Sequence, residues 1–359
     1  MKNHGTFFAP AGVIAAIALL SCATGPAPVS QAQGGEAPQG EPLWVSEPER
    51  VYPDSGWVIA VAQGSSRKEA ETAALGALAA IFKVDVEAVT TANQAMASVV
   101  EQTAGKEAGS YLKANATGLD VTALSQVNGL IGVKTESWQG SGKAWANARM
   151  NRREAAARYA ALIGESEDTI AALKAEAASM PGAFDAYQYL NLAAMLAGAA
   201  DNYRSLLSVL DPSTTGRKAA YGSAGAVKNL ANEAARRVVV AVSVRGDEGG
   251  RITTAYQEFF STRGFRTNTA GKGTYFLSSS LSLEKVDLRG NSNVFVRYVL
   301  NTTLTNPAGE GVFSYSENGR EGHLSEPEAR QRAIRKAEAS IGEETFAEKF
   351  DEYLASLIK

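Results

Sequence analysis

Cys22 carries the only thiol among the 359 residues of this chain, and it directly follows an apolar run. The run extends from Phe7 to Leu20, after a start that contains Lys2, and small residues close it. A charged start, an apolar core and small residues before a cleavage point are typical of an export signal. The run of about 14 residues is also too short for a comfortable bilayer span, which needs roughly 20. The thiol therefore stands at the end of a targeting segment, and with one cysteine no disulfide can form within the chain.

The residues Leu19-Leu20-Ser21-Cys22 resemble the lipobox of bacterial lipoproteins. That resemblance implies that signal peptidase II cuts before Cys22, that its thiol carries a diacylglyceryl group and that the new amino terminus is acylated. Two or more acyl chains anchor a protein stably, whereas one holds it only marginally. Ala23 follows, and in the usual Gram-negative sorting rule an aspartate there would retain the protein at the inner membrane. We expect a lipid-anchored envelope protein of the outer membrane; the alternative is an unmodified cysteine in the signal.

Groups that could act as a nucleophile beside a base, as a hydrolase or transferase needs, are scarce elsewhere in the chain. His4 leaves with the signal, and His323 lies in a predicted polar turn. Gly140-Ser141-Gly142-Lys143 is similar to the end of a phosphate loop, but it lacks the upstream glycine and is expected to join two strands. Three aspartates, Asp185, Asp201 and Asp211, are expected in helices or caps, away from metal-ligand spacing. The acidic run with Glu343, Glu344 and Glu348 is expected to form a solvated helix face. We therefore expect no enzyme, no cofactor and no metal site.

The charge balance is nearly even, with 35 Lys and Arg against 38 Asp and Glu. Residues 1–21 hold one lysine and no acid, so the chain from Cys22 onward carries a formal charge of −4. A nucleic-acid-binding protein would show a basic face, so no nucleic-acid partner is expected. No second apolar run of about 18 residues follows the signal, which excludes a further transmembrane helix. The remaining length suffices for two domains or more, stabilised by core burial alone.

The order of the patterns along the chain predicts an α+β fold. Residues 22–43 are rich in Pro, Gly, Gln and Ala, and such a segment buries too little apolar surface to offset its ordering entropy. After this disordered tether, a glycine-ended strand at 56–64 leads into a helix capped by Ser66-x-x-Glu69. Strands at 127–138 and 143–150 form a hairpin, and Asn151-x-x-Glu154 caps the next helix.

This first block resembles the LPP20 lipoprotein family. The pieces that carry the resemblance are Trp44-Val45-Ser46-Glu47-Pro48, the stretch from Ala60 to Ala70 and the hairpin from Trp138 to Arg149. The Gly-x-Gly of the family is Ala62-Gln63-Gly64 here. Members of the family are bacterial envelope lipoproteins, and relatives include flagellar outer-membrane accessory proteins. The resemblance covers residues 44–165 and implies no catalytic residue.

Three helical stretches and a second α+β module follow. The helices end at Pro181-Gly182, at Asp211-Pro212 and near Arg236, and the third is expected to begin near Lys218. The second module has the order β-α-β-β-β-α, which loosely repeats the first. Its expected elements are strands at 238–244, 275–286, 292–304 and 311–319, and helices at 252–262 and after Ser325-x-x-Glu328. The expected domains are a signal peptide (1–21), a tether (22–43), an LPP20-like α+β domain (44–165), a helical segment (166–236) and a second α+β domain (237–359), with mixed or antiparallel sheets in both modules.

These observations favour a non-enzymatic envelope lipoprotein that acts as a membrane-anchored scaffold or interaction module. Its expected partners are the membrane, through the lipid on Cys22, and another envelope protein. One alternative is a small-molecule or glycan-binding lipoprotein with a cleft between the modules, lined by Trp138, Trp145 or Tyr298. A second alternative is an enzyme that uses His323 or an aspartate.

Overall fold

The computed structural model describes residues 40–82, 130–140, 142–286, 292–342 and 345–358. Cys22, the predicted signal and nearly all of the predicted tether lie outside these ranges, as do Ser141, Glu343 and Glu344. Internal contacts divide the chain into Met1–Gly40 and Glu41–Lys359, and the second unit is described below. It holds two sheets with helices, so the α+β prediction is confirmed.

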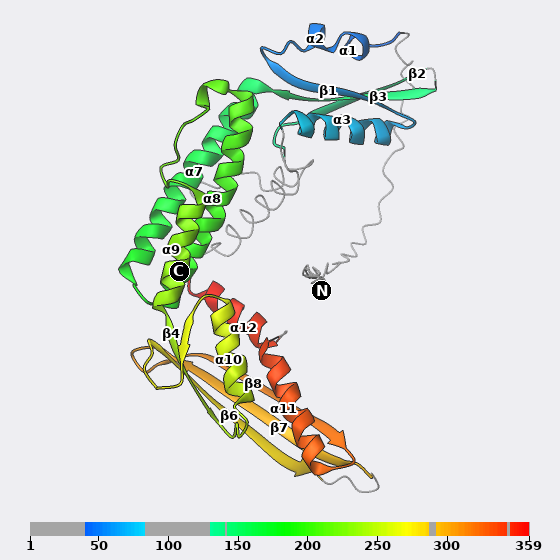
Figure 1. Ribbon diagram of the computed structural model, residues 1–359. Coiled ribbons are helices and arrows are strands. Elements are labelled where there is room, and N and C mark those ends of the chain that lie inside the picture. Colours follow the sequence, from blue (N-terminus) through cyan, green and yellow to red (C-terminus); the bar gives the residue numbers. More distant parts are fainter. Residues whose placement is uncertain (1–39, 83–129, 141, 287–291, 343–344, 359) are drawn as a thin grey trace, which may run out of the picture. The chain divides into compact units, whose positions relative to one another are not determined.

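The first sheet has three antiparallel strands in the order β1-β3-β2 (Figure 1). They are β1 (Trp57–Gly64), β2 (Lys134–Gly140) and β3 (Lys143–Asn151). The face toward helix α3 (Arg67–Ile81) is built of small side chains: Ala146 and Ala148 of β3 and Ala70 and Ala74 of α3 are all buried. Small side chains let the helix lie close to the sheet, and this explains the alanine-rich sequence of both elements.

The joint between β1 and α3 requires a glycine. A Cβ atom on Gly64 would lie 2.5 Å from the backbone nitrogen of Ala70. Two residues later, the Ser66 hydroxyl accepts a hydrogen bond from the N–H of Glu69 at 3.3 Å, as the capping pattern predicts. The Glu69 carboxylate returns to the N–H of Ser65, one residue before the expected partner.

Two Gly→Ala substitutions in this region should have opposite effects. Gly64→Ala should lower the free energy of unfolding by about 1–3 kcal/mol, because the new methyl group meets backbone that cannot move freely. Gly76→Ala, in the middle of α3 with nothing within 4 Å of the new Cβ, should raise it by about 0.5–1 kcal/mol. Urea unfolding curves of both variants give the test, and a loss of stability in Gly76→Ala would contradict this account of the helix.

The opposite face of this sheet carries α1 (Leu43–Ser46) and α2 (Pro48–Val51) (Figure 1). Trp44 is buried, and its indole N–H donates to Glu136 at 3.0 Å. Arg149 pairs with the same carboxylate at 3.0 Å and lies over the ring of Tyr52. Burial is the largest cause that raises the pKa of Tyr52, whose hydroxyl donates to Glu136 at 3.3 Å. The first described helix, α1, thus begins at Leu43, next to the residue at which folded structure was expected to start.

The first strand of the hairpin was expected at 127–138; residues 127–129 lie outside the described residues, and among the others the strand begins later than predicted. β2 begins at Lys134, and Ile131 is already buried before the strand starts. The N–H of Ile131 donates to the hydroxyl of Tyr159 at 3.0 Å, so this segment is held by a helix and not by a neighbouring strand.

Three helices connect the two sheets. They are α7 (Arg152–Ser179), α8 (Phe184–Leu210) and α9 (Ala224–Arg237). Asn151 caps α7 by accepting from the N–H of Glu154 at 3.0 Å, as predicted. Because α7 runs without a break through residue 165, the domain boundary expected there falls inside a helix. The third helix was expected from Lys218 but starts at Ala224, where the Ser223 side chain caps it.

The second sheet has five strands in the order β5-β4-β6-β7-β8. They are β4 (Val239–Arg245), β5 (Arg266–Asn268), β6 (Tyr275–Val286), β7 (Val294–Thr305) and β8 (Gly311–His323). β4 runs parallel to β5 and β6, and the other pairs are antiparallel. Helices α10 (Arg251–Thr262), α11 (Glu326–Gly342) and α12 (Thr345–Ser356) cover one face (Figure 1). The sequence did not predict β5, and one terminal helix was expected where the structure has α11 and α12.

An aromatic cluster fills the space between this sheet and its helices. Phe350 of α12 is fully buried, and its ring lies 5.3 Å from Phe260 and 5.5 Å from Phe259, measured between centroids. Phe184, the first residue of α8, also enters the cluster, 5.0 Å from Phe265. Its N–H donates to the hydroxyl of Tyr275 at 3.3 Å. The start of α8 thus belongs to the core of the second sheet.

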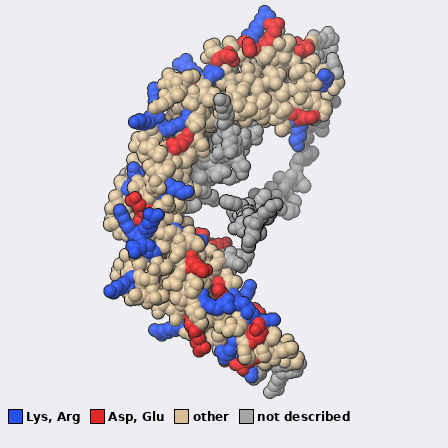
Figure 2. Space-filling model, viewed as in Figure 1, with Lys and Arg blue, Asp and Glu red and all other residues tan. Residues whose placement is uncertain are grey.

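The surface charge is mixed. Figure 2 shows Lys and Arg interspersed with Asp and Glu on the visible face of the described residues. Helix α11 is typical, since Glu326 pairs with Arg330, and Glu328 pairs with Arg332 and Arg335. Among the described helices, none combines the length and the apolar character that crossing a bilayer requires.

Candidate functional site

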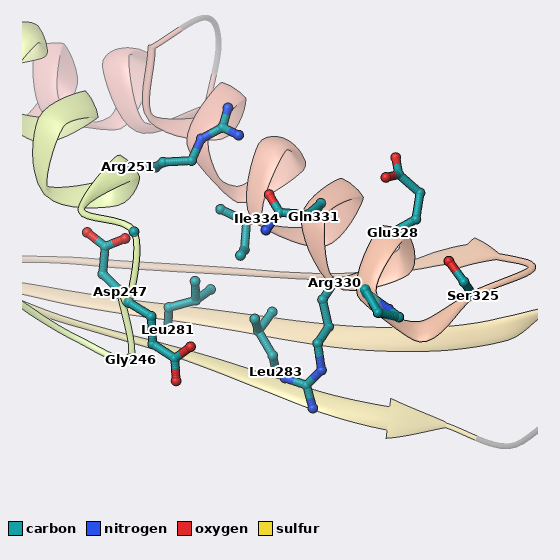
Figure 3. Close-up of a pocket in the computed structure, with 13 residues that line it drawn as sticks. Gly246, Asp247, Arg251, Leu281, Leu283, Ser325, Glu328, Arg330, Gln331 and Ile334 are labelled. Carbon is teal, nitrogen blue, oxygen red and sulfur yellow. The ribbon is translucent and has the colours of Figure 1, made fainter.

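A cavity of about 630 Å³ lies in the second module, between the turn after β4, the strand β6 and the helix α11 (Figure 3). Leu281 and Leu283 of β6 form its floor, and Ile334 of α11 faces them. Inward-facing residues alternate along β6, and Leu281 is the last of them that is buried. Leu283 is only partly covered, so the floor opens toward the end of the strand.

One wall of the cavity is the turn that carries the chain from β4 to α10. Gly246 has a φ of +77°, and a Cβ atom there would lie 2.1 Å from the carbonyl oxygen of Leu281. Asp247 then caps α10: its carboxylate accepts from the N–H of Thr253 at 2.8 Å and from the hydroxyl of the same residue at 2.8 Å. A carboxylate at a helix N-terminus is favoured by the helix dipole. The hydrogen bonds of Asp247 therefore hold this wall of the cavity against the start of α10.

The other wall is the first half of α11. Arg330 extends from the helix over Leu283, whereas Glu328 points away from β6 (Figure 3). The guanidinium of Arg330 is paired with Glu326 at 3.1 Å. A hydrogen bond from Arg335 is the largest cause that lowers the pKa of Glu328. The charged groups of this wall are therefore engaged with neighbours on their own helix.

The lining also carries charged side chains of both signs. Arg251 forms an ion pair with Glu338 between α10 and α11. Glu248 is exposed at the rim. The lining residues include no histidine or cysteine. In the part of the chain that the structure describes, no group of three or more His, Cys, Asp or Glu is placed to hold a metal ion.

The residues singled out from the sequence lie elsewhere. His323 was expected in a turn but ends β8, where its Nδ1 lies 3.3 Å from the Ser325 hydroxyl. Trp138 and Trp145 pair across β2 and β3 of the first sheet, and Tyr298 is 2% exposed in the core of the second. None of these three lines either of the two described cavities, so the cleft expected from them is not the site found here.

Two of the aspartates considered above, Asp201 and Asp211, have structural partners. Asp201 accepts from the Tyr221 hydroxyl at 2.5 Å and from the N–H of Ala224 at 3.1 Å. Asp211 caps the short helix after α8, where the hydrogen bond from the Ser213 hydroxyl is the largest cause that lowers its pKa. Asp185 lies in the first turn of α8, and Glu348 is exposed on α12. The helix and cap contexts predicted for the aspartates are confirmed.

The sequence analysis did not identify the cavity, because its lining comes from three separated segments. A partial signal is present at Gly246-Asp247, a glycine followed by a capping residue before a helix. That pattern predicts a turn, but it does not show that β6 continues beyond it.

A smaller cavity of about 230 Å³ lies among α7, α8 and α9. Apolar residues dominate it, with Leu190 and Leu230 among them and Lys174 and Arg237 at its rim. Its volume is below the usual range of ligand sites, roughly 300–1,000 Å³, whereas the cavity at β6 falls within that range.

Comparisons with known proteins add little. No protein-family description and no curated protein matches the sequence. Among solved structures, a minor lipoprotein from Acinetobacter baumannii is similar over 33% of this chain and 90% of its own, with 10% identity and a TM-score of 0.24. A secreted protein from Helicobacter pylori is similar over 80% of this chain and 98% of its own, with 10% identity and a TM-score of 0.38. TM-scores this low carry no argument about fold or function, and the resemblance to the LPP20 family stays a prediction.

Proposed function

We propose that this chain is a non-enzymatic lipoprotein of the bacterial cell envelope, anchored through Cys22, whose folded part acts as a scaffold or interaction module. The observation that carries the proposal is the single cysteine after Leu19-Leu20-Ser21, at the end of a short apolar run. A lipid on that thiol would bring the folded part to a membrane surface. The cavity at β6 supports the interaction role, because Arg251 and Arg330 in its walls are paired and its floor is apolar.

Replacing Cys22 with alanine should abolish lipid attachment. We expect incorporation of radiolabelled palmitate to fall by at least about tenfold, and the protein to move from the membrane pellet to the soluble fraction, because the acyl chains supply the anchor. Ser21→Ala is the matched control, since it alters the neighbouring residue and keeps a small side chain. A Cys22→Ala protein that stays labelled and membrane-bound would contradict the proposal.

The finer proposal is that the anchored protein resides in the outer membrane. Ala23 follows the cysteine, and Ala23→Asp should shift the protein toward the inner membrane in a density gradient. Recovery of the unaltered protein in the inner-membrane fraction would refute this part of the proposal and leave the anchor itself intact.

A second candidate function is binding of a small molecule or glycan. The cavity at β6 favours it, because a volume of about 630 Å³ suits such a ligand. A small molecule or glycan that occupies this cavity should raise the melting temperature of the Cys22→Ala protein. The same compound should cause no such rise when the protein also carries Leu283→Arg. Equal shifts in both proteins would place the ligand elsewhere.

A further inference from the structure

Strands β4 and β6 are neighbours in the second sheet but differ in length. This difference leaves part of β6 without a neighbouring strand on the β4 side. Pairing between β4 and β6 runs from Val240–Tyr275 to Arg245–Ser280 and stops there. On its other side β6 stays paired with β7 as far as Val286. In the described part of the chain, no strand pairs with Leu281–Glu284 on the β4 side, where the carbonyl of Leu281 meets Gly246 and the residues from Ser282 to Glu284 follow. A strand edge of this kind presents backbone N–H and C=O groups that can pair with another extended chain.

The fold itself ends β4 at this position. The left-handed φ of Gly246 and its close approach to the carbonyl of Leu281 turn the chain out of the sheet. Asp247 then fixes the start of α10 through its hydrogen bonds to Thr253. The cavity occupies the place where β4 would have continued, between that turn and α11 (Figure 3).

The side chains around the open edge alternate in the way that an added strand requires. Leu281 and Leu283 face the cavity and lie beneath Ile334, while Ser282 and Glu284 on the other face are exposed. An added strand would place every second side chain beside the leucines and the others beside Glu284. The exposed carboxylate of Glu284 favours a basic residue at the other position beside it. The matching sequence alternates apolar with polar or basic residues.

We propose that the Leu281–Glu284 edge of β6 binds an extended segment of a partner protein, which adds to the sheet in line with β4. Backbone hydrogen bonds would supply affinity, and the cavity over Leu283 would select an apolar side chain, as in other cases of strand addition. This inference rests on the proposed role as an interaction module and names the kind of partner that the module holds.

The test is a selection from a displayed library of random peptides of about eight residues on the chain 22–359 carrying Cys22→Ala. We expect enriched peptides to alternate apolar with polar or basic residues. Leu283→Arg should weaken the best synthetic peptide by at least about tenfold, because it places a charge on the floor of the cavity. Leu324→Arg is the matched control: Leu324 is 73% exposed outside the cavity, and this variant should bind within about twofold of the parent.

Two further measurements separate strand addition from other modes of binding. N-methylation of alternate residues of the peptide, which removes backbone donors, should weaken binding in one of the two registers by at least about tenfold. Hydrogen exchange of residues 281–284 should slow when the unmodified peptide binds. Three results would overturn the proposal. They are equal binding of the peptides N-methylated in the two registers, equal enrichment of the library on Leu283→Arg, and binding of small molecules alone. Since the Cys22→Ala protein carries no lipid, this result is independent of palmitate labelling.

Discussion

Phe350→Ala is expected to lower the free energy of unfolding of the second module by about 3–5 kcal/mol, the usual range for a buried phenylalanine. The side chain is fully buried and its ring contacts Phe184, Phe259 and Phe260. Removing this side chain leaves a cavity that the neighbouring rings of α8 and α10 cannot fill completely. Since whole domains are stable by only about 5–15 kcal/mol, the loss should be visible without denaturant at moderately raised temperature.

The distribution of tryptophan makes this prediction specific to one module. All four tryptophans belong to the first sheet and its covering helices. Phe350→Ala should therefore shift the early part of the urea transition seen by far-UV circular dichroism and leave the tryptophan-fluorescence midpoint nearly unchanged. Phe276→Ala, which removes a ring that is 38% exposed, should change stability by less than about 1 kcal/mol. Equal losses in the two variants would contradict the role given to the aromatic cluster.

Several predictions that depend on short sequence patterns were correct. The caps at Ser66 and Asn151 were predicted correctly, because a capping residue and a glutamate three positions later interact within one turn. The long strands β6 and β7 were both predicted, and β7 followed from alternation, which depends only on the face that each residue presents. The α+β class followed from the order of these elements.

Errors arose where distant parts of the chain decide the structure. Ile131 looked like a strand residue, but its N–H is taken by Tyr159 of α7. His323 was expected in a turn because Gly322 precedes it, yet pairing with Val294 extends β8 to this residue. The cavity depends on β4 ending before β6, and this difference in length exists only once the two strands are paired. The predicted lipid anchor depends on Cys22, which lies outside the described residues, so this prediction rests on the sequence alone.

Two buried tyrosines should make the protein unstable at alkaline pH. Burial is the largest cause that raises the pKa of Tyr159 and of Tyr256, in each case to about 12. Both hydroxyls are engaged in the folded state: Tyr159 accepts from the N–H of Ile131, and Tyr256 lies 2.5 Å from the Thr302 hydroxyl. In the unfolded chain both should titrate near the usual value of 10.0.

The direction in which pH changes the free energy of unfolding follows from proton binding in the folded and unfolded states. Below pH 10 both states keep the phenolic protons, so the stability is unaffected by pH through these groups. Between about pH 10 and 12 the unfolded chain releases them first, and each tyrosine should lower the free energy of unfolding by up to about 2–3 kcal/mol. Urea midpoints at pH 8 and pH 11 measure the loss. Tyr159→Phe should cost about 1 kcal/mol at pH 8, because the N–H of Ile131 loses its acceptor. It should also lessen the pH dependence of the fluorescence transition, to which Tyr203 and Tyr221 contribute as well because burial raises their pKa. Tyr256→Phe should lessen the pH dependence of the circular-dichroism transition, because Tyr256 lies in the core of the second module. If the double variant lost as much stability as the parent between pH 8 and pH 11, the alkaline instability would have to come from groups other than these two phenols.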